Sequence, residues 1–403
     1  MSKAKALSNK ALSNKISRRD ILSPFVLTIV VAFLLMAGLE AIYPFIKDNT
    51  FINGIGDTMN NQASGSVLGY LEYLIFDISQ FTFLFSPLAT VGMFVFAYLG
   101  AYLERSGSKY MGTGVDGNGH IYNSILVYSI IFTLIGELIY GKSLASFGFV
   151  PTLATYLLFQ HFVMYYGVST KKIMTIGITT TLLATPCCLL TRMTIVDTLG
   201  MPIFISIATG AILCVPLCHM IFKPMKWMTP RDRNLEPQIK KIETSKFAWF
   251  INQLLGDVGQ LGVSGSSISS IGLIVFAIIS YCLNPLSTGL GNNLLPITLF
   301  TILVTGALTI FIFYPYYEKM PVLSFGSMVT VGAFMVTYPT SPLIVALSII
   351  YSAIVPVLIT AWVFKISNYK GDYCVLPIVM FSITMAVVPF ALFIRLVLVP
   401  MGL

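Results

Sequence analysis

The chain has 403 residues, of which 56% are hydrophobic and 10% are charged, and its formal net charge is +8. A soluble domain carries about 25% charged residues, so the composition excludes a soluble globular protein, and also the disordered, collagen-like and disulfide-rich classes. We therefore expect an all-α fold, a polytopic transmembrane helical bundle. The positive charge is assigned to cytoplasmic loops rather than to nucleic-acid binding.

The N-terminal region combines a basic tail with a long apolar run. Residues 1–20 contain six Lys and Arg residues, and the apolar run extends from Ile21 to Phe45. That run is too long for a signal-peptide core and has no clear cleavage site, so a spanning helix is expected. The basic tail is then expected at the inner, anionic surface of the membrane.

Apolar runs of about 20 residues can cross a bilayer, and the chain contains eleven candidate spans. These cover residues 22–45, 83–103, 121–140, 151–168, 173–192, 200–222, 269–284, 293–315, 321–338, 342–364 and 374–398. Segment 67–82 is shorter and more polar, and we expect a half-helix there. Residues 247–266 begin apolar and become rich in Gly and Ser, which predicts an interfacial or re-entrant piece.

The distribution of Lys and Arg indicates the orientation. With eleven spans and a cytoplasmic N-terminus, 20 of the 24 Lys and Arg residues fall on the inner side, as the positive-inside rule requires. If 247–266 crosses the membrane instead, the chain has twelve spans and 18 of these residues lie inside. The charge rule prefers eleven spans, but only mildly.

Proline and threonine recur in a way that predicts an internal repeat. The first copy runs from Pro151 through Pro216, and the second from Pro296 through Pro356. Two such halves pack about a pseudo-two-fold axis and form a site between them. Eleven spans make the copies parallel and twelve make them inverted.

The expected organisation has six parts, which follow from the spans and the repeat. They are the basic cytoplasmic tail 1–20, N-terminal spans 21–104, repeat one 121–223, a cytoplasmic linker with the interfacial or re-entrant segment 224–268, repeat two 269–365 and a last span 372–403.

A family resemblance supports the repeat. The helix at Pro296-Ile297-Thr298 and the stretch from Phe325-Gly326-Ser327 to Pro339-Thr340 resemble the repeat unit of a family of bacterial polytopic membrane proteins with two tandem repeats. The stretch from Pro151 to Pro186 is similar. That family has no established activity, so the resemblance implies the repeated architecture and no function.

Prolines inside apolar runs predict broken helices and a substrate site. The candidates are Thr185-Pro186-Cys187, with Cys188 beside it, and Tyr338-Pro339-Thr340-Ser341. Proline removes a backbone donor and frees a carbonyl group, and transporters use such unwound backbone to bind a substrate or an ion. The other interpretation is a plain kink at 185–188 and a tight outer loop at 338–342.

Ionisable residues within the spans are candidates for coupling. Glu137 lies in an apolar run, and Asp77 and His161 occupy comparable positions. Charge in a membrane interior is costly and marks functional positions, and a carboxyl group or an imidazole can carry a proton. Alternatively, Glu137 anchors the interface beside Lys142, and His161 is a packing residue.

Other chemistry lacks the residues it needs. The chain has no phosphate-binding loop and no His-Glu-x-x-His motif. Ser264 has no histidine after it in the chain to act as a base, and Cys214 with Cys218 lacks a supporting His or Met array, so we expect no cofactor and no metal.

We therefore predict a permease in the inner (plasma) membrane that is not an enzyme. It contacts the lipid bilayer and moves a small neutral or singly charged solute, or an ion. The alternatives are a non-catalytic membrane subunit that binds a soluble partner at 223–246, and an integral-membrane enzyme acting on a lipid-linked substrate.

Overall fold

A computed structural model of the chain describes residues 17–79, 83–84, 86–108, 110–112, 118–145, 153–232, 245–259, 265–291, 293–317, 323–338, 341–366 and 375–402. All regular elements in these ranges are helical, which confirms the predicted fold class. In chain order they are α2 (Arg18–Ile46), α3 (Ile55–Ala63), α4 (Val67–Ser79), α5 (Pro87–Arg105), α6 (Tyr122–Ala145), α7 (Leu153–Tyr166), α8 (Thr170–Thr191), the π-helical turn η2 (Arg192–Val196), α9 (Asp197–Leu199), α10 (Phe204–Phe222), α11 (Lys246–Val258), α12 (Ser267–Leu283), η5 (Pro285–Ser287), η6 (Gly289–Gly291), α13 (Leu295–Phe313), η7 (Tyr314–Tyr316), α14 (Leu323–Met335), α15 (Pro342–Ile366), α16 (Val375–Phe393), η8 (Ile394–Leu398) and η9 (Val399–Met401).

Eight helical runs in the described ranges are long and apolar enough to cross a membrane. They are Arg18–Ile46, Pro87–Arg105, Tyr122–Gly141, Thr170–Leu199, Phe204–Phe222, Leu295–Tyr316, Pro342–Ile366 and Leu376–Met401. Helix α12 and the helix within α14 are apolar but shorter. The chain is therefore a multi-pass membrane protein.

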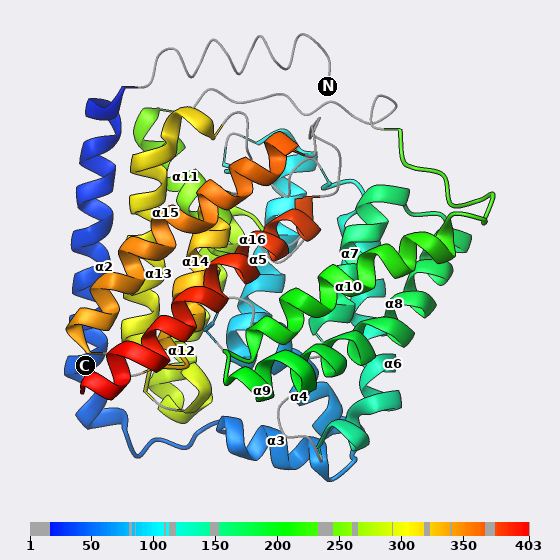
Figure 1. Ribbon diagram of the computed structural model, residues 1–403, viewed down its shortest axis with the longest axis horizontal. Coiled ribbons are helices and arrows are strands. Elements are labelled where there is room, and N and C mark those ends of the chain that lie inside the picture. The colour runs from blue at the N-terminus through cyan, green and yellow to red at the C-terminus, as the bar shows by residue number, and fades with distance from the viewer. Residues whose placement is uncertain are drawn as a thin grey trace.

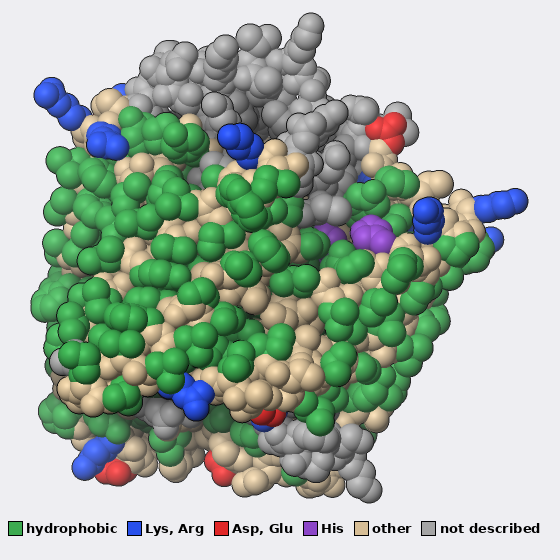
Figure 2. Space-filling view, viewed as in Figure 1, with side chains coloured by type: hydrophobic (Ala, Val, Ile, Leu, Met, Phe, Trp, Pro, Cys, Tyr) green, Lys and Arg blue, Asp and Glu red, His purple; other side chains and the backbone are tan. Residues whose placement is uncertain are grey.

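The outer surface has the character of a lipid-facing wall. Figure 2 shows a broad band of apolar side chains, with Lys, Arg, Asp and Glu gathered at its upper and lower rims. On α2, Phe33 and Leu34 are 53% and 62% exposed. An apolar surface this extensive does not face water in a soluble monomer, so it contacts the hydrocarbon of the bilayer.

The two ends of the bundle can be told apart by the contacts made there. At one end, Asp20 near the start of α2 forms an ion pair with Lys246 at the start of α11, with 2.7 Å between Oδ2 and Nζ. At the other end, Asn49 donates to the backbone oxygen of Cys282, near the end of α12. Helix α2 begins at the top of Figure 1 and α16 ends at the bottom. The start of α2 and the end of α16 therefore lie at opposite ends of the bundle; the choice between eleven and twelve spans stays a prediction.

Helices α4 and α11 enter the bundle and end inside it. Each has 13 residues, about 20 Å of helix, which is too short to cross a bilayer. Their last turns are buried, and Asp77 and Asp257 are 0% and 5% exposed. The half-helix expected within 67–82 is confirmed. Residues 246–258, within the segment expected to be interfacial or re-entrant, form a helix whose last residues Gly256, Asp257 and Val258 are buried.

The helices pack as two bundles with the same pattern of neighbours (Figure 1). In the first bundle, residues 67–222, α4 packs on α5, α6 and α7, while α8 packs on α6, α7 and α10. In the second bundle, residues 246–393, α11 packs on α12, α13 and α14, while α15 packs on α13, α14 and α16. The bundles meet mainly through α5 with α12 and α10 with α16.

Candidate functional site

Two helices begin in the interior of the protein, and an aspartate accepts hydrogen bonds at the start of each. The backbone N–H of Leu153, the first residue of α7, donates to Asp77 Oδ2 at 2.7 Å. The backbone N–H of Ser324, at the start of α14, donates to Asp257 Oδ2 at 3.1 Å, and the Ser324 hydroxyl donates to the same oxygen. A carboxylate is favoured there because helix N-termini present free N–H groups and positive partial charge.

The residues around both aspartates match in sequence at a constant spacing of 180 positions. The identical pairs are Leu74 and Leu254, Asp77 and Asp257, Gln80 and Gln260, Ser86 and Ser266, Gly92 and Gly272, Val95 and Val275, Phe96 and Phe276, and Ala97 and Ala277. No gap is needed in this stretch. Ser86 and Ser266 also occupy the same structural position, because each caps the N-terminus of the next helix, α5 or α12.

Helices α5 and α12 cross with mirrored contacts. A Cβ added to Gly92 would lie 2.6 Å from the backbone oxygen of Gly272, and one added to Gly272 would lie 2.5 Å from the backbone oxygen of Gly92. Phe96 meets Phe276 with 6.4 Å between ring centroids. Gly100, beyond Gly92 on α5, lies beside Ser266, which precedes Gly272 on α12, so the helices are antiparallel.

These contacts relate the two halves in a register and orientation that differ from those expected from the sequence. The sequence interpretation paired Pro151, before α7, with Pro296 in α13. The structure gives α7 and α14 the same role, because their first N–H groups bind matched aspartates. The eleven-span interpretation expected parallel copies, whereas α5 and α12, which carry the matched residues, run antiparallel; the repeat itself stays a prediction.

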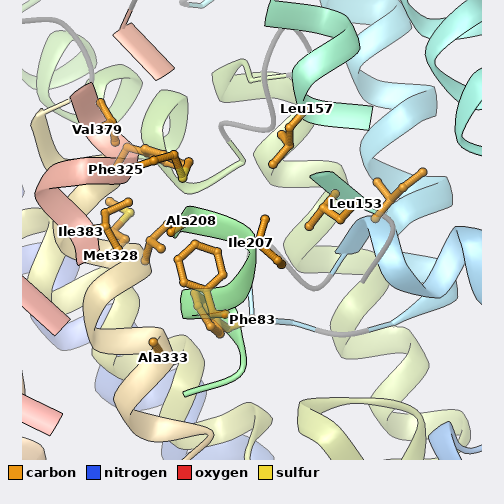
Figure 3. Packing of buried hydrophobic residues seen from close by; sticks show 14 of the residues in the cluster. Phe83, Leu153, Leu157, Ile207, Ala208, Phe325, Met328, Ala333, Val379 and Ile383 are labelled. Atoms are coloured by element: carbon orange, nitrogen blue, oxygen red, sulfur yellow. The ribbon is translucent and has the colours of Figure 1, made fainter. Parts of the chain in front are cut away.

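Apolar side chains pack between the two capped helices. Figure 3 shows Phe83 beside Ile207 and Ala208 of α10, with α14 on one side and Leu153 of α7 on the other. The Phe83 ring packs so closely on the α14 backbone that a Cβ at Gly332 would lie 2.3 Å from it. Phe83 is 1% exposed, and its ring also contacts the ring of Phe204 at the start of α10, with 5.4 Å between centroids.

Buried hydroxyl groups without a hydrogen-bond partner occur in both bundles. Thr155 is in the first turn of α7, and Ser327 is near the start of α14; both are 0% exposed. Others of the same kind are Thr90, Thr185, Thr298, Thr305, Ser348 and Ser352. Buried hydroxyl groups ordinarily have a partner. These groups therefore offer binding capacity for water or for a polar solute.

The predicted break at Thr185-Pro186-Cys187 is absent. Helix α8 continues from Thr170 through Pro186 to Thr191, because one missing N–H donor does not interrupt the rest of the hydrogen-bond ladder. The irregular backbone lies further on, in the π-helical turn η2. Thr185 and Cys187 are buried, and Cys188 lies against Gly210 of α10.

The second predicted segment lies at a helix boundary. Pro339 and Thr340 are outside the described residues. The Tyr338 N–H donates to the backbone oxygen of Phe334 at the end of α14, and Ser341 Oγ accepts from the Ile344 N–H at the start of α15. This segment lies between α14 and α15 in the second bundle, whereas Thr185 lies on α8 in the first.

Of the three predicted coupling residues, the structure groups two. Asp77 and Glu137 are both 0% exposed and lie on α4 and α6, which pack together. Gln62 of α3 donates to Glu137 Oε2 at 3.0 Å. His161 lies two turns beyond the start of α7, and its Nε2 is buried and without a hydrogen-bond partner.

Metal ligands do not cluster in the part of the chain that the structure describes: no group of three or more His, Cys, Asp or Glu side chains is placed to hold an ion there. Cys214 Sγ and Cys218 Sγ lie 3.6 Å apart on α10. Asp257, and the N–H groups at the starts of α7 and α14, were not identified from the sequence. The constant spacing of 180 positions between matched residues is the signal that could have identified them.

Comparison with known proteins adds no identity. No protein-family model matches the chain, and no significantly similar curated protein was found.

Proposed function

We propose that this protein is a membrane permease that moves a small solute by alternating access between the two bundles. The bundles are inverted copies of one unit, related by a pseudo-two-fold axis through the contact between Gly92 and Gly272. The mirrored capping of α7 and α14 is the observation that carries the proposal, because half-helices that end inside a membrane protein supply substrate sites in transporters with inverted repeats.

The solute site is proposed between the starts of α7 and α14. Thr155 and Ser327 provide unpartnered hydroxyl groups there, whereas Asp77 and Asp257 already bind backbone N–H groups. A neutral or singly charged solute with hydrogen-bonding groups fits such a lining. Phe83 then separates this site from one side of the membrane in the conformation described.

Location and orientation follow from charge. We propose the inner (plasma) membrane and a cytoplasmic N-terminus, because the basic loops lie on the side of the N-terminal tail.

The linker at 223–246 is on that side as well. Residues 233–244 of it lie outside the described residues, and binding of a soluble partner there is the competing function.

Accessibility of single cysteines tests alternating access. In a chain without native cysteines, Thr155→Cys and Ser327→Cys are each treated with a membrane-impermeant thiol reagent from either face. We expect both positions to be labelled from both faces, and one solute from a panel to slow the labelling. Labelling from both faces requires that the site open to each in turn.

Thr133→Cys is the matched control, because Thr133 is equally buried but its hydroxyl donates to the Ser129 backbone oxygen at 2.7 Å. It should remain unlabelled. If Thr155→Cys and Ser327→Cys are also unlabelled in folded protein, the two bundles do not alternate and the partner-subunit function is favoured.

A further inference from the structure

The hydroxyl groups inside the second bundle are of two kinds. A Ser or Thr in a helix ordinarily donates to the backbone oxygen three or four residues earlier, and Thr301 and Thr309 of α13 do so. Thr305, Ser348 and Ser352 are also 0% exposed, but their hydroxyl groups have no hydrogen-bond partner. A buried hydroxyl group without a partner costs free energy. This second kind therefore indicates that a bound group supplies the missing contacts.

The three unpartnered hydroxyl groups lie at one level of the bundle. Thr309 also donates to the Ala353 backbone oxygen of α15 at 3.2 Å, and Ala353 directly follows Ser352 in the chain. Helices α13 and α15 pack together, and both run from the lower to the upper end of the molecule in Figure 1. One turn before Thr309 on α13 is Thr305. It therefore lies level with the turn of α15 that joins Ser348 to Ser352, two residues on one face of that helix.

A proline adds a backbone oxygen at this level. Pro356 of α15 has no N–H, so the backbone oxygen of Ser352, four residues earlier, lacks its ordinary helical partner. In the first bundle, the corresponding oxygen is that of Leu182, four residues before Pro186 in α8, and it accepts from the Tyr140 hydroxyl at 3.0 Å. Where the first bundle places a tyrosine hydroxyl, the second brings serine and threonine hydroxyl groups to the same level.

The lining formed in this way consists of neutral oxygen atoms, which are the ligands that hard cations prefer. Zinc and calcium sites use His, Cys or carboxylate ligands, none of which occurs in the sequence of α13 or α15. Without a carboxylate among the ligands, the lining suits one positive charge better than two. The direct contact between Thr309 and the backbone of α15 shows that the two helices lie close together, which favours a small ion.

Asp257 supplies negative charge near this level. A Cβ at Gly306, the residue after Thr305, would lie 2.8 Å from the Leu254 side chain, and Leu254 is one turn before Asp257 on α11. The Asp257 carboxylate binds the start of α14, so it remains in place whether or not an ion is present. In a buried region of low dielectric constant, a carboxylate this close attracts a cation and repels an anion.

We propose that a sodium ion binds at the contact between α13 and α15. Its ligands are the hydroxyl oxygens of Thr305, Ser348 and Ser352 and the backbone oxygen of Ser352, which replace part of the hydration shell of the ion. The inference goes beyond the proposed function, because a sodium ion can bind here whether or not the two bundles alternate. Cysteine labelling decides alternating access separately.

Equilibrium binding of radioactive sodium to the purified full chain in detergent tests this site without any transported solute. Choline chloride keeps the ionic strength constant. We expect saturable binding of about one ion per chain, with displacement by unlabelled sodium and weaker displacement by potassium, which is the larger ion. Absence of saturable binding to folded protein would overturn the proposal, because the hydroxyl groups would then hold water alone. Equal displacement by potassium would overturn the choice of sodium.

Matched substitutions on α13 locate the ion. Thr305→Val removes one proposed ligand and should weaken sodium binding by at least about tenfold. Thr301→Val is the control, because Thr301 is equally buried but its hydroxyl donates to the Thr298 backbone oxygen at 3.0 Å; this variant should bind sodium as the unsubstituted chain does. Ser352→Ala keeps the test decisive if Thr305→Val does not fold, and it should weaken binding by a similar factor. Unchanged affinity in folded Thr305→Val or Ser352→Ala would overturn the site.

Discussion

The first bundle, residues 67–222, and the second, residues 246–393, begin with the same arrangement of helices but differ in their other buried polar groups. Each opens with a half-helix that ends in an aspartate, and each aspartate holds the start of another interior helix. In the second bundle Asp257 binds both the N–H and the hydroxyl of Ser324, whereas Leu153, its counterpart in the first, has no side-chain donor. Glu137 exists only in the first.

The largest expected effect on stability tests the pseudo-two-fold axis that we propose between the bundles. Gly92→Ala and Gly272→Ala each place a Cβ within 2.6 Å of a backbone oxygen on the opposing helix. Because backbone cannot move aside as a side chain can, each should cost about 3 kcal/mol of stability, measured by thermal unfolding in detergent. The two losses should be similar, since the contacts are mirrored.

Gly38→Ala on α2 is the control, because nothing lies within 4 Å of a Cβ there. It should leave stability unchanged or raise it slightly, since Ala favours a helix over Gly. Clearly unequal losses for Gly92→Ala and Gly272→Ala would argue against a two-fold relation of the bundles.

The next effect distinguishes the two aspartates. Asp257→Ala leaves the N–H and the hydroxyl of Ser324 without their acceptor, so we expect a loss of about 3 kcal/mol, against about 2 kcal/mol for Asp77→Ala. Thermal unfolding of both variants measures the difference. Ser324→Ala removes only the hydroxyl and should bring the cost of losing Asp257 close to that of Asp77. A larger loss for Asp77→Ala would reverse the comparison.

The smallest effect compares the two capping serines. Ser266 Oγ accepts from the Ser269 N–H at 3.0 Å, and Ser269 Oγ accepts from the Ser266 N–H. Ser86 Oγ accepts from the Ala89 N–H at 3.3 Å. Ser266→Ala should therefore cost about 1 kcal/mol and Ser86→Ala about 0.5 kcal/mol. Equal losses in unfolding experiments would show that the reciprocal bond at Ser269 adds nothing.

Much of the fold was predictable, but the site was less so. The short helices within 67–82 and 247–266 were recognisable because polar and small residues interrupt apolar runs there. The helix break expected at Pro186 is absent, because a helix packed against its neighbours tolerates the loss of one backbone N–H donor. Glu137 and Asp77 were recognisable as intramembrane acids. Asp257 was overlooked, because it lies in a segment with more polar neighbours and its burial comes from packing.

The sequence by itself determined that this is a helical membrane protein, where most of its helices lie and which end carries the basic loops, because length, hydropathy and charge act locally. Only the tertiary structure decided that α5 and α12 run antiparallel, that α7 pairs in role with α14, and that Gln62 reaches Glu137. These relations join residues 75 or more positions apart. They depend on which helix faces pack together, which no local pattern encodes.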